Sequence, residues 1–333
     1  MVYTINSMIC IEKVTSQQAW DEFVCKMGGH PLQLWGWGEV KVGHGWHAIR
    51  LKLTGKSGSA GAQILTKKLP VVGKCIAYIP RGPFINNLKT DEVLDALAKY
   101  ARVSLGAISL SVEPHWEDVA MPKGWRHTKH TILIPSTLIL DLKKSEDELM
   151  NDIARKRRYD IRKSTKDVYE LREATTEEDI RKCLELYHYT AERAGFALHD
   201  DAYYFSIASK LGAASKLMAV WNEAGEPIAF TWLAVTPSVA FELYGGINDE
   251  GTHLRANFAL KWYCITTMKA NGVQQYDFNG LLNDGISTFK RNFATHENML
   301  VGTYDKPLSP LYYVWNVLLP SAKHVYRMLH RSK

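Results

Sequence analysis

The hydrophobic positions in the first part of the chain predict helices and strands in alternation. SQQAWDEFVCKM (16–27) has apolar residues at helical spacing behind Ser16, which fits a helix N-cap. WHAIRLKL (46–53) alternates apolar and polar residues as a strand does, and GAQILTKKL (61–69) follows after a turn rich in Gly and Ser. One α/β unit is completed by a buried strand at KCIAYIP (74–80), a helix over 90–103 with Thr90 at its N-cap, and a strand over 106–114.

A second unit with the same order of elements begins at STLILDL (136–142). Helical patterns over 145–164 and 175–195 precede strands, and the later helix over 254–272 ends at Gly272, a predicted C′ glycine. The predicted strands cover 216–222, 227–235, 239–247 and 273–280. The repeated order predicts an α/β (α+β) fold of two tandem domains, over 1–137 and 138–307.

Composition favours a globular protein of a reducing compartment. The 333 residues are 46% hydrophobic and 23% charged, and the five cysteines are scattered without a C-x-x-C pair, so neither a disulfide framework nor a zinc site is expected. HGWH (44–47) and HTKH (127–130) lack a carboxylate partner, and we expect no metal. No secretory signal and no apolar run of membrane-spanning length is apparent, so a cytoplasmic location is expected.

Positive charge is concentrated in two segments, within a net charge of +6. RKRRYDIRKSTK (155–166) carries a single acid, Asp160, and no acid follows Asp305. Such segments suit phosphate-bearing partners, although a solvated helix face is the simpler alternative. LYYVWNVLLPSAKHVYRMLHRSK (311–333) mixes aromatic and basic residues as interfacial segments do. We expect 308–333 to pack back on the first domain or to touch the inner membrane face.

Five short motifs occur in order along the chain. They are QLWGWGEVK (33–41), YIPRGP (78–83), RKRRYDIRKS (155–164), AERAGFALHDDAYY (191–204) and DFNG (277–280) with FKRNF (289–293). Together they resemble the FemABX family of aminoacyl-tRNA-dependent peptidyltransferases, over about residues 17–305. The resemblance implies two GNAT-like domains with a cleft between them. The long helical hairpin of larger members is not apparent, so the chain resembles the compact, FemX-like form.

The resemblance implies three catalytic residues. Lys290 corresponds to the family's catalytic lysine, where a fixed cation would stabilise the tetrahedral oxyanion of ester aminolysis, and one good donor is worth roughly 3 kcal/mol. Phe289 would exclude water from that charge. Asp277 would orient the incoming amine. The alternatives from the residues alone are a strand-edge lysine among core aromatics and a carboxylate that merely ends a turn.

The acceptor residues also follow from the resemblance. Lys41 and Trp37 match positions that hold the sugar-diphosphate, and His199 stands where compact members commonly place an arginine. Arg193, Arg81 or Arg255 is then a candidate to compensate for this difference. The expected substrate-binding set is Lys41, Trp37, Arg81, Gly82, His199, Tyr203, Tyr244 and Asn279. Packing roles for the tyrosines, and a turn role for Lys41, remain open alternatives.

Proton transfer and RNA binding are less sharply indicated. No clear general base is apparent, although His188, His199 and Asp277 are candidates. A reaction without a general base, through the leaving ribose hydroxyl, is preferred, with proximity supplying much of the rate. The expected tRNA-binding set is Arg155, Lys156, Arg158, Arg162 and Lys163. An acceptor-phosphate contact by Arg158 or Arg162 is the alternative.

The function implied is transfer of an amino acid from aminoacyl-tRNA to a stem-peptide amine of lipid II or UDP-MurNAc-pentapeptide, forming the interpeptide bridge. The basic C-terminal segment favours lipid II, and no cofactor is expected beyond the aminoacyl-tRNA co-substrate. An acyl-CoA-dependent N-acyltransferase is one alternative, but no Gly-rich pyrophosphate loop precedes the helix at 254–272. A non-catalytic RNA- or envelope-binding relative is the other.

Overall fold

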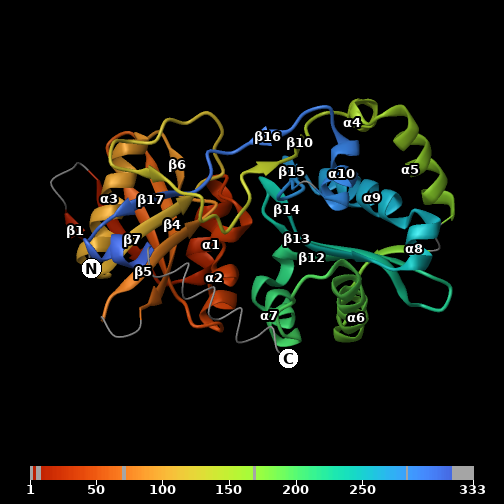
Figure 1. Ribbon diagram of the computed structural model, residues 1–333. Helices are drawn as coiled ribbons and strands as arrows, with labels where there is room; N and C mark the ends of the chain where they lie inside the picture. The colour runs from red at the N-terminus through yellow and green to blue at the C-terminus, as the bar shows by residue number, and fades with distance from the viewer. Residues whose placement is uncertain (1–2, 5–8, 70–72, 168–169, 283, 317–333) are drawn as a thin grey trace.

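Two β-sheets flanked by helices lie side by side in the computed structural model, which describes residues 3–4, 9–69, 73–167, 170–282 and 284–316 (Figure 1). The strands of the first sheet, in spatial order, are β1 (Tyr3–Thr4), β2 (Cys10–Val14), β3 (His47–Thr54), β4 (Ser59–Lys68), β5 (Cys75–Pro80), β7 (Ala107–Glu113), β17 (Tyr304–Pro307) and β8 (Arg126–His127), with β6 (Phe84–Asn86) paired to β4. β5 and β7 are parallel, and α3 (Thr90–Val103) forms the crossover between them.

Three further helical segments belong to the first domain: α1 (Gln17–Lys26), η1 (Pro31–Gln33) and α2 (Trp35–Val42). Ser16 caps α1 by accepting the Ala19 N–H, as predicted. The predicted cap of α3 is wrong: Thr90 is its first helical residue, and Lys89 precedes it without a side-chain capping bond. The acidic first turn at Asp91 and Glu92 stabilises that end through the helix dipole instead.

The second sheet is built from β10 (Ile139–Asp141), β15 (Gln275–Asp277), β14 (Val239–Ile247), β13 (Pro227–Val235), β12 (Ser215–Trp221) and β11 (Glu170–Glu173), in that spatial order. Its helices are α4 (Glu146–Asp152), α5 (Arg155–Asp167), α6 (Glu177–Ala194), α7 (Asp201–Leu211), η2 (Gly212–Ala214), α8 (Asp249–Leu254), α9 (Ala256–Ala270), α10 (Gly285–Lys290) and η3 (Arg291–Phe293). The predicted helix over 145–164 is two helices, because Ile153 is extended and buries its side chain in the core.

The parallel strands β14 and β15 separate after three residues. They pair over Val239–Phe241 and Gln275–Asp277, and the rest of β14 has no partner on that side. A register shift opposite Trp232 and Leu233 makes a β-bulge in β14 at the same level. An unpaired strand edge beside a bulge is a common place for a binding cavity.

The two domains share a continuous apolar core. One cluster contains Trp20, Leu32 and Trp37 from the first domain, with Tyr203 and Phe241 from the second. α2 packs against α7 across this boundary. A buried, packed contact of this kind holds the two sheets in a fixed relation, which matters because the acceptor residues come from both domains.

The chain returns to the first sheet near its end, before the predicted boundary at 307. β16 (Asn298–Met299) pairs with β9 (Ser136–Thr137), and β17 then joins β7 of the first sheet. Leu308 packs on the first core, and Tyr312 donates to Asp305 at 3.0 Å, so the start of the C-terminal segment lies on the first domain. Residues 317–333, which carry most of the predicted membrane segment, lie outside the described residues.

Candidate active site

Lys290 lies at the end of α10, with its ammonium group turned inward. Asp284 begins this short helix by accepting the Ser287 N–H, so TFKRNF forms helical turns and no strand. The Lys290 Nζ donates to the carbonyls of Phe278, Asn279 and Gly280 at 2.6, 2.8 and 3.3 Å. Three carbonyl acceptors use all three protons of an ammonium, and they favour the charged form.

The electrostatic environment of Lys290 is mixed. Burial lowers its pKa from the ordinary 10.5; Glu242 opposes this effect, and Lys261 adds to it. The charge is therefore costly to keep at this position, and the carbonyl cradle is what holds it there. A desolvated cation acts strongly on any charge that develops beside it.

A cavity of about 410 Å³ opens beside Lys290 along the unpaired edge of β14. It is lined from α6 (Tyr187, Thr190, Arg193, Ala194), Phe196, β13 and β14 (Ala229 to Thr231 and Glu242 to Ile247), α9 (Asn257, Leu260, Lys261), Asn279, and α10 (Gly285, Ile286, Phe289, Lys290). All of these residues belong to the second domain. The cavity is thus not the interdomain cleft that we expected to hold the catalytic lysine.

Phe289 forms an apolar part of this cavity wall, as expected for a residue that excludes water. Its ring packs edge-on against Phe258 of α9, with the ring centroids 4.9 Å apart. Phe293 packs on both rings, at 5.3 Å from Phe289 and 6.0 Å from Phe258. These contacts fix α10, and with it Lys290, on α9.

A buried ion pair between Glu242 and Lys261 lies in the cavity wall, and sequence reasoning missed it. The Lys261 ammonium binds the Glu242 carboxylate, which also accepts the Tyr276 hydroxyl at 2.8 Å. Both side chains are nearly fully buried. The available signal was a charge on an otherwise apolar element in each case: Glu242 in VAFELYGGI and Lys261 in ANFALKWYCITTMKA.

The predicted acceptor residues meet where α2 contacts α7. The Lys41 Nζ donates to the Tyr203 hydroxyl at 2.8 Å and lies 4.5 Å from the Trp37 ring centroid, in cation–π geometry. The close approach of the helices depends on Gly36, because a Cβ there would lie 2.1 Å from the Lys210 carbonyl oxygen. Folding therefore brings Tyr203 of α7 to Lys41 and Trp37 of α2, although Tyr203 and Lys41 are 162 residues apart in the sequence.

Two imidazoles extend this acceptor cluster toward solvent. The His199 ring packs on Tyr203 with centroids 4.1 Å apart, and the His44 ring contacts Tyr203 at 4.8 Å. Burial lowers the pKa of His199, with Lys41 and His44 acting in the same direction. Sequence reasoning considered His44 only as a metal ligand, and its place beside His199 was not predicted. Lys41, His44 and His199 together form a basic surface suited to a diphosphate.

Tyr244 joins the acceptor cluster to the Lys290 cavity. Its hydroxyl lies 3.4 Å from that of Tyr203, and its side chain also lines the cavity. The β-bulge explains the geometry: Glu242 faces Lys261 of α9, whereas Tyr244 packs on Tyr204 of α7, on the opposite face of the sheet. Without the bulge, residues two apart on a strand would share one face.

Asp277 does not occupy the position expected of a group that orients the incoming amine. Its side chain is fully buried and does not line the cavity. It accepts the Thr137 hydroxyl and the Asn279 N–H, while Asn279 has positive φ and offers its carbonyl to Lys290. Asp277 therefore acts on Lys290 through the Asn279 turn. Asn279 lines the cavity as predicted, and its amide donates to the Glu242 carbonyl at 2.9 Å.

Arg81 and Gly82 also lie away from the cavity, and both are buried. The Arg81 guanidinium donates to the Ile134 carbonyl at 3.3 Å, and a Cβ on Gly82 would meet the Gln33 side chain at 2.8 Å. Neither residue is open to an acceptor. Arg193 and Arg255 do not enter the acceptor cluster either, since they pair with Asp249 and Asp160.

His30, His115 and Asp277 place one possible metal-ligand atom each within 4.8 Å of one another. His30 Nδ1 accepts the Leu32 N–H at 3.1 Å, so its neutral ring carries the proton on Nε2 and cannot ligate there. Among the described residues, His30 Nε2, Arg81 Nε, His115 Nδ1 and Asp277 Oδ2 are buried without partners. The His115 Nδ1 lies 3.8 Å from Asp277 Oδ2, so these two side chains approach each other without forming a hydrogen bond.

The predicted tRNA-binding helix, α5, packs on α9 next to Lys290. Arg157 donates to the Asn292 side chain of η3 at 3.0 Å, and its guanidinium lies 5.5 Å from the Phe258 ring centroid. The predicted contact residues Arg155, Lys156, Arg162 and Lys163 are exposed, while Arg158 is half-buried and donates to Asn151. The exposed bases thus lie on the helix that packs against α9, which forms part of the cavity wall.

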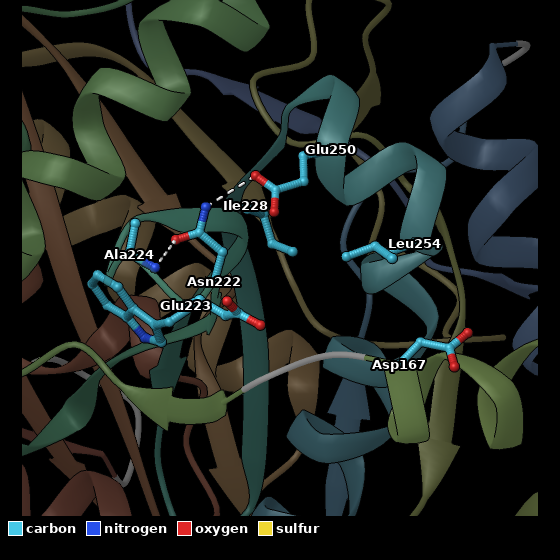
Figure 2. Close-up of a pocket in the computed structure, with 8 residues that line it drawn as sticks. Asp167, Asn222, Glu223, Ala224, Ile228, Glu250 and Leu254 are labelled. Atoms are coloured by element: carbon cyan, nitrogen blue, oxygen red, sulfur yellow. Dashed lines mark hydrogen bonds between the residues drawn. The ribbon is translucent and has the colours of Figure 1, made fainter.

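A separate hollow of about 350 Å³ lies at the β12–β13 turn (Figure 2). Its lining includes the carboxylates of Asp167, Glu223 and Glu250, and Asn222 donates to Glu250 at 3.0 Å. None of the predicted site residues lines it. Its negative charge disfavours phosphate-bearing partners, in contrast to the Lys290 cavity.

Among the residues that the structure describes, no helix has the length and hydrophobicity needed to cross a membrane. The predicted peripheral contact with a membrane stays a prediction, because its segment lies largely beyond residue 316.

The chain is similar in sequence to proteins of known activity. A lipid II:glycine glycyltransferase of Staphylococcus aureus (strain USA300) is 28% identical over 303 residues, which cover 84% of this chain and 66% of the relative. The chain thus spans just under two-thirds of that protein. The protein of the same name in strain MSSA476 is 25% identical over 399 residues, which cover 90% of this chain and 93% of that protein.

Solved structures show the same fold. The crystal structure of FemX superposes with a TM-score of 0.81 at 22% identity and covers 91% of this chain and 99% of its own. A tandem GNAT protein of the clavulanic acid biosynthesis pathway gives a TM-score of 0.51 at 10% identity, and the match covers 91% of this chain and 99% of that protein. The predicted pair of GNAT-like domains is therefore confirmed. The FemAB family model matches residues 123–222 and 206–319, which together are more than half of the chain. The chain belongs to the FemAB family.

Proposed function

We propose that the chain transfers an aminoacyl group from aminoacyl-tRNA to a stem-peptide amine of a peptidoglycan precursor. The observation that carries this proposal is the Lys290 ammonium, held by three backbone carbonyls beside a cavity that reaches the acceptor cluster through Tyr244. A fixed, desolvated cation is the group that aminolysis of an ester most needs, because the reaction develops an oxyanion.

The proposed reaction needs no cofactor. The acceptor amine attacks the ester carbonyl carbon, and the tetrahedral intermediate places its negative oxygen toward Lys290. The bond from carbon to the ribose oxygen then breaks, an amide forms, and the amine proton ends on the ribose hydroxyl. Holding amine and ester together supplies much of the rate, since effective molarities of oriented groups reach about 10⁵ M or more.

Lys290 can contact the oxyanion by exchanging one carbonyl partner. Its bond to the Gly280 carbonyl, at 3.3 Å, is the longest of the three and the weakest by geometry. The other two bonds, at 2.6 and 2.8 Å, would keep the ammonium in place during this exchange. Phe289 in the cavity wall limits access of water, which would otherwise hydrolyse the ester.

The acceptor diphosphate is proposed to bind Lys41, His44 and His199, with Trp37 and Tyr203 holding the lysine in place. The stem peptide would then extend past Tyr244 toward Lys290. The relatives named lipid II:glycine glycyltransferases support lipid II as the acceptor. The soluble nucleotide-linked precursor carries the same diphosphate and is the alternative.

The exposed bases of α5 are proposed to bind the tRNA acceptor stem. They share a helix with Arg157, which contacts η3 directly after Lys290, so RNA bound there would lie close to the cavity. Contacts to phosphates are tolerant of sequence and sensitive to salt. Use of aminoacyl-tRNA would place the reaction in the cytoplasm, with a lipid-linked acceptor reached at the inner membrane face.

A transfer assay tests the proposal. The purified chain is supplied with tRNA charged with glycine, alanine or serine, and with lipid II and UDP-MurNAc-pentapeptide in parallel. We expect an amide product extended by one amino acid, and loss of that product in Lys290→Met. Lys143→Met is the matched control, because Lys143 is exposed and does not line the cavity. Absence of transfer from every charged tRNA, together with stabilisation by CoA, would instead favour the acyl-CoA alternative.

A further inference from the structure

The wall of the Lys290 cavity carries one negative charge that the oxyanion mechanism does not use. Among the described lining residues the charged side chains are Arg193, Glu242, Lys261 and Lys290, so Glu242 is the only carboxylate. A carboxylate beside a developing oxyanion opposes the reaction by simple repulsion. Lys261 pairs with this carboxylate through one of its two oxygens, so only the second oxygen remains to bind a cation of the substrate.

Glu242 is held so that one oxygen is occupied and the other is free. Its Oε1 receives both the Lys261 ammonium and the Tyr276 hydroxyl. Its Oε2 has no hydrogen-bond partner among the described residues. Because Oε2 is not among the fully buried atoms that lack a partner, it keeps some exposure. Since Glu242 lines the cavity and both of its hydrogen bonds are to Oε1, Oε2 is the oxygen left to bind a group in that space.

The neighbours of Glu242 fix this orientation. Its own backbone carbonyl accepts the Asn279 amide at 2.9 Å, and Asn279 also provides a carbonyl to Lys290. Lys261 is anchored on α9 and approaches the Thr231 hydroxyl at 3.4 Å. The same turn therefore sets the position of a free carboxylate oxygen and of the Lys290 ammonium.

We propose that Glu242 Oε2 binds the α-ammonium of the aminoacyl ester, so that the site selects donors with a free, protonated α-amino group. This inference rests on the proposed function and names its donor class. In an aminoacyl ester the ammonium is two bonds from the reacting carbonyl carbon. One cavity then provides Lys290 for the oxyanion and Glu242 for the cation beside it. Lys261 neutralises Glu242 in the free protein and lowers the cost of burying the carboxylate.

Paired donors on the same tRNA test the proposal. Alanyl-tRNA is compared with lactyl-tRNA, and glycyl-tRNA with glycolyl-tRNA, in which a neutral hydroxyl replaces the ammonium at nearly equal size. We expect the amino donor to have a kcat/KM about 10- to 100-fold higher, as for loss of one charged hydrogen bond. In Glu242→Gln we expect that ratio to shrink at least fivefold. The intrinsic reactivity of the two esters cancels in the comparison of the variant with the unmodified chain. Glu223→Gln, on an exposed turn, is the matched control and should keep the ratio.

A second measurement needs no variant, in case Glu242→Gln does not fold. The ratio of kcat/KM for the amino and hydroxy donors is followed as a function of pH. The ratio is divided by the same ratio for uncatalysed aminolysis of the two esters, because protonation of the α-amino group also makes the ester more electrophilic. The corrected ratio should fall as pH rises through the α-amino pKa of the donor, because only the ammonium form gains from Glu242. Effects on Lys290 and on the acceptor amine act on both donors and cancel.

The outcomes separate the two levels of the proposal. A ratio independent of pH, or unchanged in a folded Glu242→Gln, overturns the role of Glu242 while leaving the transfer reaction intact. In Glu242→Gln, kcat/KM could fall equally for the amino and hydroxy donors, and the acidic limb of its pH profile could disappear. That result would indicate that Glu242 is a general base and would likewise overturn the inference. No transfer from any donor would refute the proposed function itself.

Discussion

Replacing Lys290 by methionine tests the central role assigned to the cavity. The substitution keeps most of the side-chain length but removes the ammonium that donates to the carbonyls of Phe278, Asn279 and Gly280. Two separate effects follow. The oxyanion loses its fixed charge, and the three carbonyls lose their shared donor.

The two effects differ in size and in the quantity that they change. Loss of one oxyanion donor costs about 3–4 kcal/mol of transition-state stabilisation, which lowers kcat about 10²–10³-fold. The freed carbonyls cost roughly 1–3 kcal/mol of stability, and removal of a desolvated cation offsets part of that. We therefore expect a folded variant with a modest decrease in Tm and a large decrease in kcat.

Single-turnover transfer from labelled aminoacyl-tRNA, under conditions where the acceptor is saturating, measures the chemical step. Lys290→Arg should recover part of the rate, because it restores the charge but cannot fit all three carbonyls. Lys143→Met should match the unmodified chain. If a folded Lys290→Met retains a rate within about tenfold of the unmodified chain, the assignment of oxyanion stabilisation to Lys290 is wrong.

Four further predictions follow from the site. Lys41→Met should raise KM for the acceptor with little change in kcat, since its contacts are to Tyr203 and Trp37; an unchanged KM would argue against diphosphate binding there. Asp277→Asn should lower Tm and reduce kcat by less than tenfold, which corresponds to less than about 1.4 kcal/mol of activation free energy, because the buried carboxylate acts through the Asn279 turn. A loss of kcat equal to that of Lys290→Met would show that Asp277 acts directly. Acceptor binding should tighten as pH falls, because the pKa of His199 is lowered below 6.5 in the free protein and a bound diphosphate favours the imidazolium; titration calorimetry on His199→Gln should show a flatter pH dependence. Arg155→Ala combined with Lys156→Ala should raise KM for tRNA and reduce its salt dependence, and a salt slope identical to that of the unmodified chain would exclude these phosphate contacts.

Most of the fold could be predicted from local pattern. VAFELYGGI gives β14 with its bounds unchanged, and Thr176 caps α6 by accepting the Asp179 N–H. The break between α4 and α5 could not be predicted in this way, because Ile153 leaves the helix to bury its side chain in the tertiary core. Periodicity alone does not report such a competition between local and tertiary preference.

The candidate site was predicted unevenly for a similar reason. Motif positions identified Lys290, Lys41 and Tyr203, because the sequence carries their residue types directly. The contacts of Asp277 and Glu242 depend on the separation of β14 from β15 and on the bulge in β14. Those features arise from strand pairing across the sheet, so a carboxylate expected in the cavity proved to be buried behind it, and the one that lines the cavity was not considered.

The most direct test of the account is a crystal structure of the chain with a stable, amide-linked aminoacyl-RNA analogue. We predict that the aminoacyl carbonyl oxygen lies within hydrogen-bonding distance of Lys290 Nζ, inside the cavity along β14 and next to Tyr244. An analogue bound in the groove between the domains, with the Lys290 ammonium still shared among its three carbonyls and remote from the ester position, would contradict the account.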